Sequence, residues 1–274
     1  MTVCVPSRPV VEQREDSLFD LDTLSLPAFA PGSVWLVGAG PGDPGLLSLL
    51  ALHGLRQADR VVHDALIDSR LLDLIRPGAA IEAWGKRGGQ ASPRQETITA
   101  RLIDRAGQGE RVLRLKGGDP LVFGRGAEEA LALALAGVPF RIVPGITAGI
   151  GGLAYAGIPV SAGGVAGGVA LVTGHGPDGA LPEEIDRLAL APVLVVYMGL
   201  AHLAALSQKL IAAGRDPAEP AALVEAAATP RQRVVETRLD SLAACAETAA
   251  ITAPALVVVG PVVALRAQLD WWRP

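Results

Sequence analysis

The chain has 274 residues, half of them apolar, with a formal net charge of −4 and a mean hydropathy of +0.37. Its longest apolar stretches, such as 193–206, are interrupted and fall short of the roughly 18 to 20 residues that span a bilayer, which argues against a membrane protein. With 4 % aromatic residues and no basic block, the composition also argues against a nucleic-acid surface. We therefore expect a small-molecule partner.

Residues 1–31 are rich in proline and acidic residues and show no clear periodicity, which predicts a flexible N-terminal extension. The segment lacks the basic start and apolar core of a secretory signal. Two cysteines, Cys4 and Cys245, give no disulfide framework. These features together predict a cytoplasmic protein.

From residue 34, short β-branched runs alternate with alanine- and leucine-rich runs, a pattern typical of an α/β fold with a largely parallel first sheet. The first half predicts strands at 34–37, 60–63, 80–84, 111–115 and 140–143 and helices at 45–57, 68–75, 95–107 and 126–136. The glycine-rich stretch 144–168 predicts an interdomain connection. Beyond it we expect strands near 169–173, 193–197, 221–225, 232–237 and 255–259 and a helix at 200–213. The chain length allows two domains, 32–147 and 148–274, and we expect the ligand between them.

Two glycine turns follow predicted strands, GAGPGDP at 38–44 and LKGGDP at 115–120. The first formally matches the dinucleotide pattern G-x-G-x-x-G, so a dinucleotide oxidoreductase is one alternative. However, Asp43 would place a negative charge beside a pyrophosphate, and prolines remove backbone donors. The turns instead suit a phosphate-free ligand that approaches the backbone closely. The structural alternative is that each aspartate only caps its own turn.

Longer motifs carry a resemblance to a known family. They are VGAGPGDPGLLSLLAL (37–52), VVHDALI (61–67), GKRGG (85–89), RLKGGDPLVFGRGAEEA (114–130), VPGITAG (143–149), AYAGIPV (154–160), VTGH (172–175) and VVYMGL (195–200). From about residue 34 to 272 the chain resembles the tetrapyrrole methyltransferases, with the motifs in family order. The resemblance implies two α/β domains with a cofactor cleft between them, and a homodimer.

The resemblance also implies that S-adenosyl-L-methionine is the methyl donor and S-adenosyl-L-homocysteine the product. A cationic sulfonium removes the objection that Asp43 raises against a phosphate ligand. The cofactor positions carried over from the family are Pro41, Gly117, Gly118, Asp119, Val122, Thr147, Ala148, Met198 and Ala227. Relatives often have Asn-Gly-Thr where this chain has Ala226-Ala227-Ala228. A backbone contact survives this change, whereas a threonine hydroxyl contact does not.

The implied reaction methylates two pyrrole carbons of uroporphyrinogen III to give precorrin-2 through precorrin-1, for cobalamin or sirohaem synthesis. Such a reaction must align the methyl group with the carbon and move a proton. By the resemblance, Asp64 is the proton acceptor, Lys86 the proton donor, and Arg125 and Glu128 contact the substrate, the arginine also being a candidate base. The structural alternatives are a helix cap for Asp64, a surface charge for Lys86 and a simple ion pair for Arg125 and Glu128.

A substrate with eight carboxylates predicts a cationic pocket. The cations available for it in the first domain are Lys86, Arg87, Arg94, Arg114, Lys116 and Arg125. Among these, Arg87 and Arg94 are the additional substrate anchors that we expect. His53, His175 and His202 have no metal-ligand spacing, so we expect no metal.

The chain also departs from the family pattern. Relatives commonly have Thr-His-Arg where this chain has Ser161-Ala162-Gly163, a tyrosine where it has His63, and a histidine near Gln90. Two alternatives therefore stay open within this fold: a methyltransferase that acts on a later corrin precursor, and a low-activity protein that binds the cofactor and a tetrapyrrole.

Overall fold

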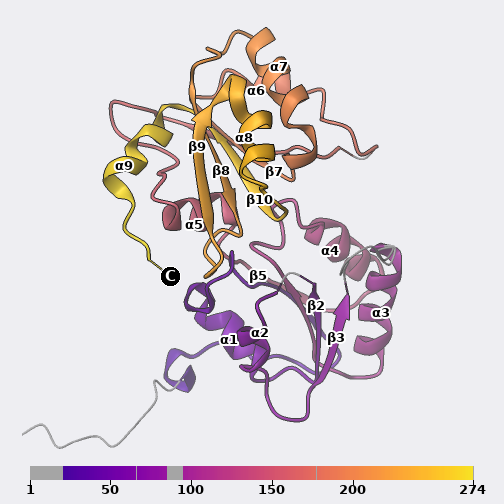
Figure 1. The fold of residues 1–274 in the computed structure, drawn as a ribbon. Coiled ribbons are helices and arrows are strands. Elements are labelled where there is room, and N and C mark those ends of the chain that lie inside the picture. The colour runs from indigo at the N-terminus through magenta and orange to yellow at the C-terminus, as the bar shows by residue number, and fades with distance from the viewer. Residues whose placement is uncertain (1–20, 66, 85–94, 177, 274) are drawn as a thin grey trace, which may run out of the picture.

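The structure is a computed structural model that describes residues 21–65, 67–84, 95–176 and 178–273. Within these ranges the strands form two five-stranded sheets, one in each half of the chain. Figure 1 shows the two halves stacked, with α5 at the end of the second half that lies toward the first half. The predicted α/β class is therefore confirmed.

The first sheet is entirely parallel, with the strand order β3-β2-β4-β1-β5. Its strands are β1 (Val34–Gly38), β2 (Arg60–Asp64), β3 (Ala80–Trp84), β4 (Val112–Lys116) and β5 (Phe140–Val143). Strands β1 and β4 are buried at every position, as parallel strands covered on both faces are. In this sheet β1 and β4 are neighbours, so the turns that follow them lie side by side.

Helices cover both faces of this sheet (Figure 1). They are α1 (Leu49–Leu55) and α2 (Ser69–Leu72) on one face, and α3 (Gln95–Gly107) and α4 (Gly126–Leu135) on the other. Local signals set their starts: Ser48 accepts a hydrogen bond from the amide of Ala51, and Asp68 accepts one from the amide of Arg70.

The second sheet is mixed, with the order β6-β7-β10-β8-β9. Its strands are β6 (Val169–Thr173), β7 (Val193–Tyr197), β8 (Pro220–Glu225), β9 (Arg233–Arg238) and β10 (Ala255–Val259). Only β6 and β7 run parallel among these. One face packs against α6 (Ile185–Leu188), α7 (Leu203–Ala212) and α8 (Leu242–Thr248). The other packs against α5 (Ala148–Tyr155) and the 3-10 helix Pro261–Leu265, which precedes α9 (Arg266–Leu269).

Helix α5 corrects the expectation that 144–168 is only a connection. Its glycines hide the helical pattern, but close packing requires them. A Cβ atom at Gly149 would lie 2.3 Å from the Tyr197 hydroxyl, and one at Gly152 would lie 2.7 Å from the Cβ of Ala227. The low helix propensity of glycine is therefore overridden by tertiary contacts that tolerate no side chain.

The described part of the N-terminal segment, 21–31, packs against the first sheet. Phe29 is 2 % exposed, and its ring stacks on Trp35 with a centroid distance of 4.5 Å. The carbonyl oxygen of Phe29 accepts a hydrogen bond from Arg111 Nε at 2.8 Å. Residues 1–20 lie outside the described residues.

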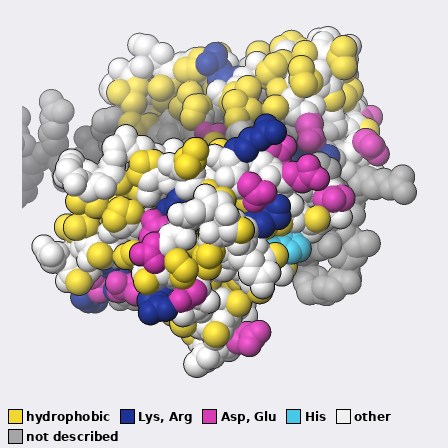
Figure 2. Space-filling model, turned by 90° about the horizontal axis from the view of Figure 1, so that it is seen from above, with side chains coloured by type: hydrophobic (Ala, Val, Ile, Leu, Met, Phe, Trp, Pro, Cys, Tyr) yellow, Lys and Arg dark blue, Asp and Glu magenta, His cyan; other side chains and the backbone are white. Residues whose placement is uncertain are grey.

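None of the helices that the structure describes has both the length and the apolar character needed to cross a membrane. On the face shown in Figure 2, basic and acidic side chains lie beside one another between apolar ones. This face therefore presents mixed charges and not a field of one sign.

Candidate functional site

The two glycine turns are joined directly by their backbones. Gly40 and Gly118 exchange two hydrogen bonds, from the Gly118 amide to the Gly40 carbonyl at 2.8 Å and from the Gly40 amide to the Gly118 carbonyl at 3.2 Å. Gly118 has φ +65°, in the left-handed region that glycine adopts without strain. The parallel pairing of β1 with β4 therefore brings Pro41, Gly117, Gly118 and Asp119 to one place.

The turn 144–147 closes against this pair. A Cβ atom at Gly145 would lie 2.2 Å from the carbonyl oxygen of Gly118, and one at Gly38 would lie 2.5 Å from the Cα of Gly145. In contrast, a Cβ at Gly117 would meet nothing within 4 Å. Gly38, Gly118 and Gly145 thus form a close-packed backbone floor, and Gly117 has open space beside it.

Both aspartates cap their own turns, as the structural alternative proposed. Asp43 Oδ1 accepts from the amide of Gly45 at 2.8 Å, and Asp119 Oδ1 accepts from the amide of Leu121 at 2.8 Å. Their second oxygens cross to other segments: Asp43 Oδ2 accepts from the Tyr155 hydroxyl at 2.9 Å, and Asp119 Oδ2 accepts from the amide of Gly145 at 3.0 Å. Each carboxylate therefore holds its turn against a neighbouring segment.

Tyr197, at the end of β7, connects the second domain to this floor. Its hydroxyl lies 2.7 Å from Thr147 Oγ1 and accepts a hydrogen bond from the Gly149 amide at 2.7 Å. Its ring lies 5.0 Å from that of Phe123. Burial raises the pKa of Tyr197, which keeps the hydroxyl neutral and able to donate. Thr147 and Ala148 are held in this way, and Met198 follows Tyr197 directly.

The loop 226–228 also reaches the first glycine turn. A Cβ atom at Gly42 would lie 3.0 Å from the carbonyl oxygens of both Ala227 and Ala228. Ala227 is buried, and its methyl group faces Gly152 of α5. Ala227 therefore presents its backbone carbonyl, and not its side chain, to the first glycine turn.

Backbone conformation marks the same region. The non-glycine residues with positive φ in the described chain are Ser25, Phe123, Arg125, Met198, Ala226, Ala228 and Ala250. Five of these seven lie in the loops just described or in the segment that follows the second turn. Residues held in sparsely populated conformations concentrate at functional sites, so their position here is an independent indication of a site.

Arg125 and Glu128 form an exposed ion pair at the start of α4. Arg125 Nε lies 2.6 Å from Glu128 Oε2, and both side chains are 57 % exposed. Arg125 has φ +60° and follows Val122 and Phe123 in the segment after the second turn. Both side chains are open to a ligand, as their predicted substrate role requires.

Asp64, at the end of β2, belongs to a buried charge cluster. Its carboxylate forms an ion pair with Arg114 and is 34 % exposed, whereas Arg114 is almost fully buried. Arg114 Nε lies 3.2 Å from Glu129 Oε1, and Lys116 Nζ lies 3.1 Å from the Glu129 carboxylate. Burial lowers the pKa of Lys116, the charge of Arg114 lowers it further, and the Glu129 carboxylate opposes this shift. The Asp64 carboxylate is thus held by a buried arginine, and its side chain caps no helix among the described residues.

These contacts correct the expectation that Arg114 and Lys116 are cations available to the substrate pocket. Arg114 and Lys116 are buried and paired inside the domain, so they are unavailable to substrate carboxylates. The predicted site residues Lys86, Arg87 and Arg94 lie outside the described residues. Sequence reasoning missed Tyr197, Tyr155 and Glu129; the signal for Tyr197 was its place beside Met198.

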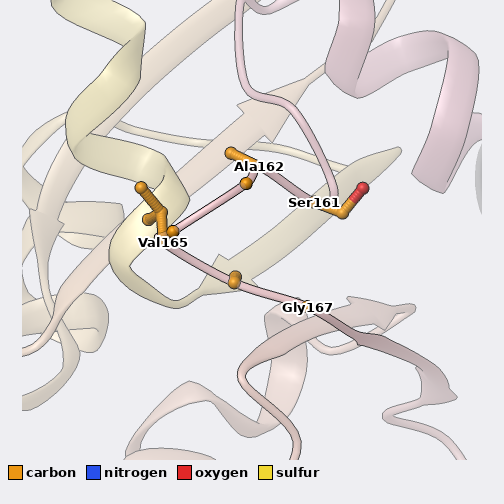
Figure 3. A pocket seen from close by; sticks show the side chains of 7 residues that line it. Ser161, Ala162, Val165 and Gly167 are labelled. Atoms are coloured by element: carbon orange, nitrogen blue, oxygen red, sulfur yellow. The ribbon is translucent and has the colours of Figure 1, made fainter.

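Residues 161–163, where the chain departs from the family pattern, help to line an open hollow of about 460 Å³ (Figure 3). The loop turns back on itself, since Ala162 and Ala166 exchange backbone hydrogen bonds of 3.0 and 2.9 Å. The lining residues are Ser161, Ala162, Gly163, Gly164, Val165, Ala166 and Gly167. In Figure 3 the Ser161 hydroxyl points away from the Ala162 and Val165 side chains. These lining residues offer no cationic side chain to a carboxylate.

The site fits a ligand of the predicted chemistry. The space beside Gly117 allows a close approach to the backbone, and Leu121, Phe123, Ile146 and Met198 expose apolar surface in the same segments. These features suit an adenosyl group and a methionine chain better than a pyrophosphate. No group of three or more His, Cys, Asp or Glu side chains placed to hold a metal ion occurs among the described residues.

Comparison with known proteins agrees with this geometry. The family of tetrapyrrole (corrin/porphyrin) methylases matches residues 33–243. The chain is 58 % identical over 249 residues to uroporphyrinogen-III C-methyltransferase from a Sinorhizobium species, covering 90 % of this chain and 89 % of that protein. It is 49 % identical over 246 residues to siroheme synthase of Azotobacter vinelandii, which covers 89 % of this chain; the chain spans only 53 % of that protein.

Solved structures show the same fold. A crystal structure of uroporphyrin-III C-methyltransferase from Thermus thermophilus, complexed with S-adenosyl homocysteine, is 42 % identical with a TM-score of 0.75, covering 85 % of this chain and 99 % of that one. The cobalt precorrin-4 methyltransferase structure is 26 % identical with a TM-score of 0.76, covering 87 % and 99 % of the two chains. The chain therefore belongs to the tetrapyrrole (corrin/porphyrin) methylase family.

Proposed function

We propose that this protein methylates uroporphyrinogen III at two pyrrole carbons with S-adenosylmethionine, giving precorrin-2 by way of precorrin-1. The observation that carries the proposal is the 58 % identity, over nearly the whole length of both chains, to a uroporphyrinogen-III C-methyltransferase. The joined glycine turns and the methylase family match support it. When bound, the sulfonium supplies an electrophilic methyl group.

The cofactor set that we propose has its members in the joined turns and the loops that face them. It comprises Pro41, Gly117, Gly118, Asp119, Val122, Thr147, Ala148, Met198 and Ala227. The contacts among these segments support the assignment, because Asp119 holds Gly145, Tyr197 holds Thr147, and Ala227 approaches Gly42. We also propose that the domains divide near residue 147, where β5 and the following turn lead into α5.

We assign Asp64 as the proton acceptor, because it is a partly exposed carboxylate at a strand end and its partner Arg114 is fixed. Arg125 and Glu128 contact the substrate, since both are exposed beside the second turn. Lys86 as proton donor, and Arg87 and Arg94 as carboxylate anchors, stay predictions outside the described residues. A homodimer in the cytoplasm likewise stays a prediction, which sedimentation and fractionation test.

A second candidate acts on a later corrin precursor. The uncharged lining of 161–167 motivates it, because this loop presents different side chains from the Thr-His-Arg common in relatives. The likeness to a cobalt precorrin-4 methyltransferase also keeps it open. A protein that binds both ligands without methyl transfer is the remaining alternative, and a calorimetric titration distinguishes it.

The test is anaerobic incubation with uroporphyrinogen III and methyl-labelled S-adenosylmethionine, following the mass of the tetrapyrrole. A gain of two methyl groups is the expected result. If cofactor binds but no methyl group is transferred to uroporphyrinogen III, the proposal is wrong. A panel of later corrin precursors then decides between the two remaining candidates.

A further inference from the structure

Arg114 is a buried cation whose two carboxylate partners differ in exposure, because Glu129 is fully buried and Asp64 reaches the surface. Arg114 lies on β4, with Val62 of β2 on one side and Leu36 of β1 on the other. Its side chain is 2 % exposed, yet it carries a full positive charge. Burying a guanidinium is unfavourable unless anions and hydrogen-bond acceptors replace the water it loses.

The acceptors of Arg114 come from different elements, with Glu129 on α4 and Asp64 at the end of β2. Nε is 3.2 Å from Glu129 Oε1, a carboxylate that is fully buried. Nη1 is 3.4 Å from the carbonyl oxygens of Val62 and Leu115, and Nη2 binds Asp64 Oδ1. The guanidinium therefore spans from the interior of the domain to the one carboxylate in the cluster that reaches the surface.

Glu129 is itself held from several directions. Gln95 Nε2 donates to its Oε1 at 2.7 Å, and Lys116 Nζ lies 3.1 Å from each of its oxygens. Its Oε2 makes only the ion contact with Lys116 and no hydrogen bond among the described residues. With Arg114 and Lys116 both charged, two cations share this single buried anion, and Asp64 supplies the second negative charge.

We propose that Arg114, anchored on Glu129, is a positioning residue that fixes the orientation of the Asp64 carboxylate toward the reacting substrate. The inference rests on the function proposed above and adds a residue to its machinery. A carboxylate at a strand end has free rotation about two side-chain bonds, and a buried planar partner removes that freedom. Because the Arg114 side chain is 2 % exposed and offers almost no surface to a ligand, we expect it to act only through Asp64.

The test is a double-mutant cycle on methyl transfer with Arg114→Met and Asp64→Asn. Arg114→Met is expected to lower kcat by about 10- to 100-fold, with affinity for S-adenosylhomocysteine within about threefold of the wild type. Because Arg114 acts through Asp64, adding Arg114→Met to Asp64→Asn is expected to lower kcat no further. If the kcat losses of the two single variants multiply in the double variant, the proposal is overturned, because Arg114 then affects turnover independently of Asp64.

Arg60→Met is the matched control. Arg60 begins β2, has a side chain that is 14 % exposed against 2 % for Arg114, and pairs with Glu82 and Glu110 at the other end of the strand. It is expected to lower thermal stability while leaving kcat unchanged. If Arg114→Met does not fold, Arg114→Lys keeps the charge but cannot bridge both carboxylates, and it takes the same place in the cycle. A kcat for this variant within about threefold of the wild type overturns the proposal.

A readout without activity separates this inference from the proposed function. If the wild type transfers no methyl group, the proposed function fails, and crystal structures of the wild type and Arg114→Lys decide the positioning role. The Asp64 carboxylate is expected in one orientation in the wild type and in several in the variant. The same single orientation in both overturns the proposal.

Discussion

The two sheets differ in what they bury. The first domain buries Arg114 and Lys116 of β4 and Glu129 of α4, close to the turns at the carboxyl end of its sheet. The second sheet packs its two faces with apolar side chains, and the charged residue buried in it, Glu225, binds Thr252 and Arg233 near the surface. The buried charges beside the proposed proton acceptor thus lie in one half, whereas the other half has an apolar interior, and the Tyr197 hydroxyl links the two by its hydrogen bond with Thr147.

The largest effect is expected on turnover, from a substitution at the end of β2 in the first sheet. Asp64→Asn removes the proposed proton acceptor but keeps the size of the side chain, so it should lower methyl-transfer turnover by about 10²- to 10⁴-fold. Affinity for the cofactor should stay within a few-fold of the wild type, because the turns proposed to hold it are unchanged. Stopped-time assays and calorimetry measure the two quantities. Unchanged turnover would remove Asp64 from the mechanism.

A substitution in the apolar core of the second sheet should lower the free energy of unfolding and leave turnover unchanged. Leu223→Ala in β8 removes a fully buried side chain from the apolar core and should cost about 2 to 5 kcal/mol of unfolding free energy. Turnover per folded molecule at low temperature should equal that of the wild type. Urea denaturation and assays on the folded fraction check this. A large loss of turnover in folded protein would show that the second core also shapes the chemistry.

One added methyl group in the close-packed backbone of Gly38, Gly118 and Gly145 is expected to lower both stability and cofactor affinity. Gly145→Ala places a Cβ 2.2 Å from the Gly118 carbonyl oxygen, so it should cost about 1 to 3 kcal/mol and weaken cofactor binding. Gly163→Ala is the control, because a Cβ there meets nothing within 4 Å and its φ is not positive. Equal melting temperatures and equal cofactor affinities for the two variants would contradict the close-packed floor.

The ion pair between Arg101 and Glu82, away from the site, should make a smaller contribution to stability that depends on pH. The hydrogen bond from Arg101 chiefly lowers the pKa of Glu82 from 4.5 to about 2, against the opposing effect of burial. Because the folded pKa lies below the unfolded one, the stabilisation is present above pH 4.5 and is lost as the pH falls toward 2. Glu82→Gln should therefore cost about 1 to 3 kcal/mol at neutral pH, and less as acid is added. A difference from the wild type that stays constant from pH 6 to pH 3 would exclude this origin.

The smallest effect is expected at the contact between the halves. Tyr197→Phe leaves the Gly149 amide and the Thr147 hydroxyl without their partner, at a cost of about 1 to 2 kcal/mol. Cofactor affinity should fall by about three- to tenfold, while kcat at saturation should change little. Equilibrium titration with S-adenosylhomocysteine measures this, and an unchanged affinity would show that Tyr197 does not support the site.

Much of the fold could be predicted from the sequence, because strands such as 193–197 and 255–259 are short apolar runs between turn signals. Helix α5 could not, since its glycines are explained only by partners far away in the chain, such as Tyr197 and Ala227. The site turns were recognisable from Gly-Asp-Pro at 42–44 and 118–120. The pairing of Arg114 with Asp64 and Glu129 was not, because it depends on strand register and on the helix that follows.

The most direct test of the account is a crystal structure of the protein with S-adenosylhomocysteine. The account predicts the ligand between the joined turns and the second domain, with its polar atoms on the backbone near Gly117, Thr147 and Ala227. The Asp64 carboxylate should lie on the same side as the sulfur. Ligand bound instead in the hollow of 161–167, or against no part of the glycine turns, would contradict the central claim that these turns hold the cofactor.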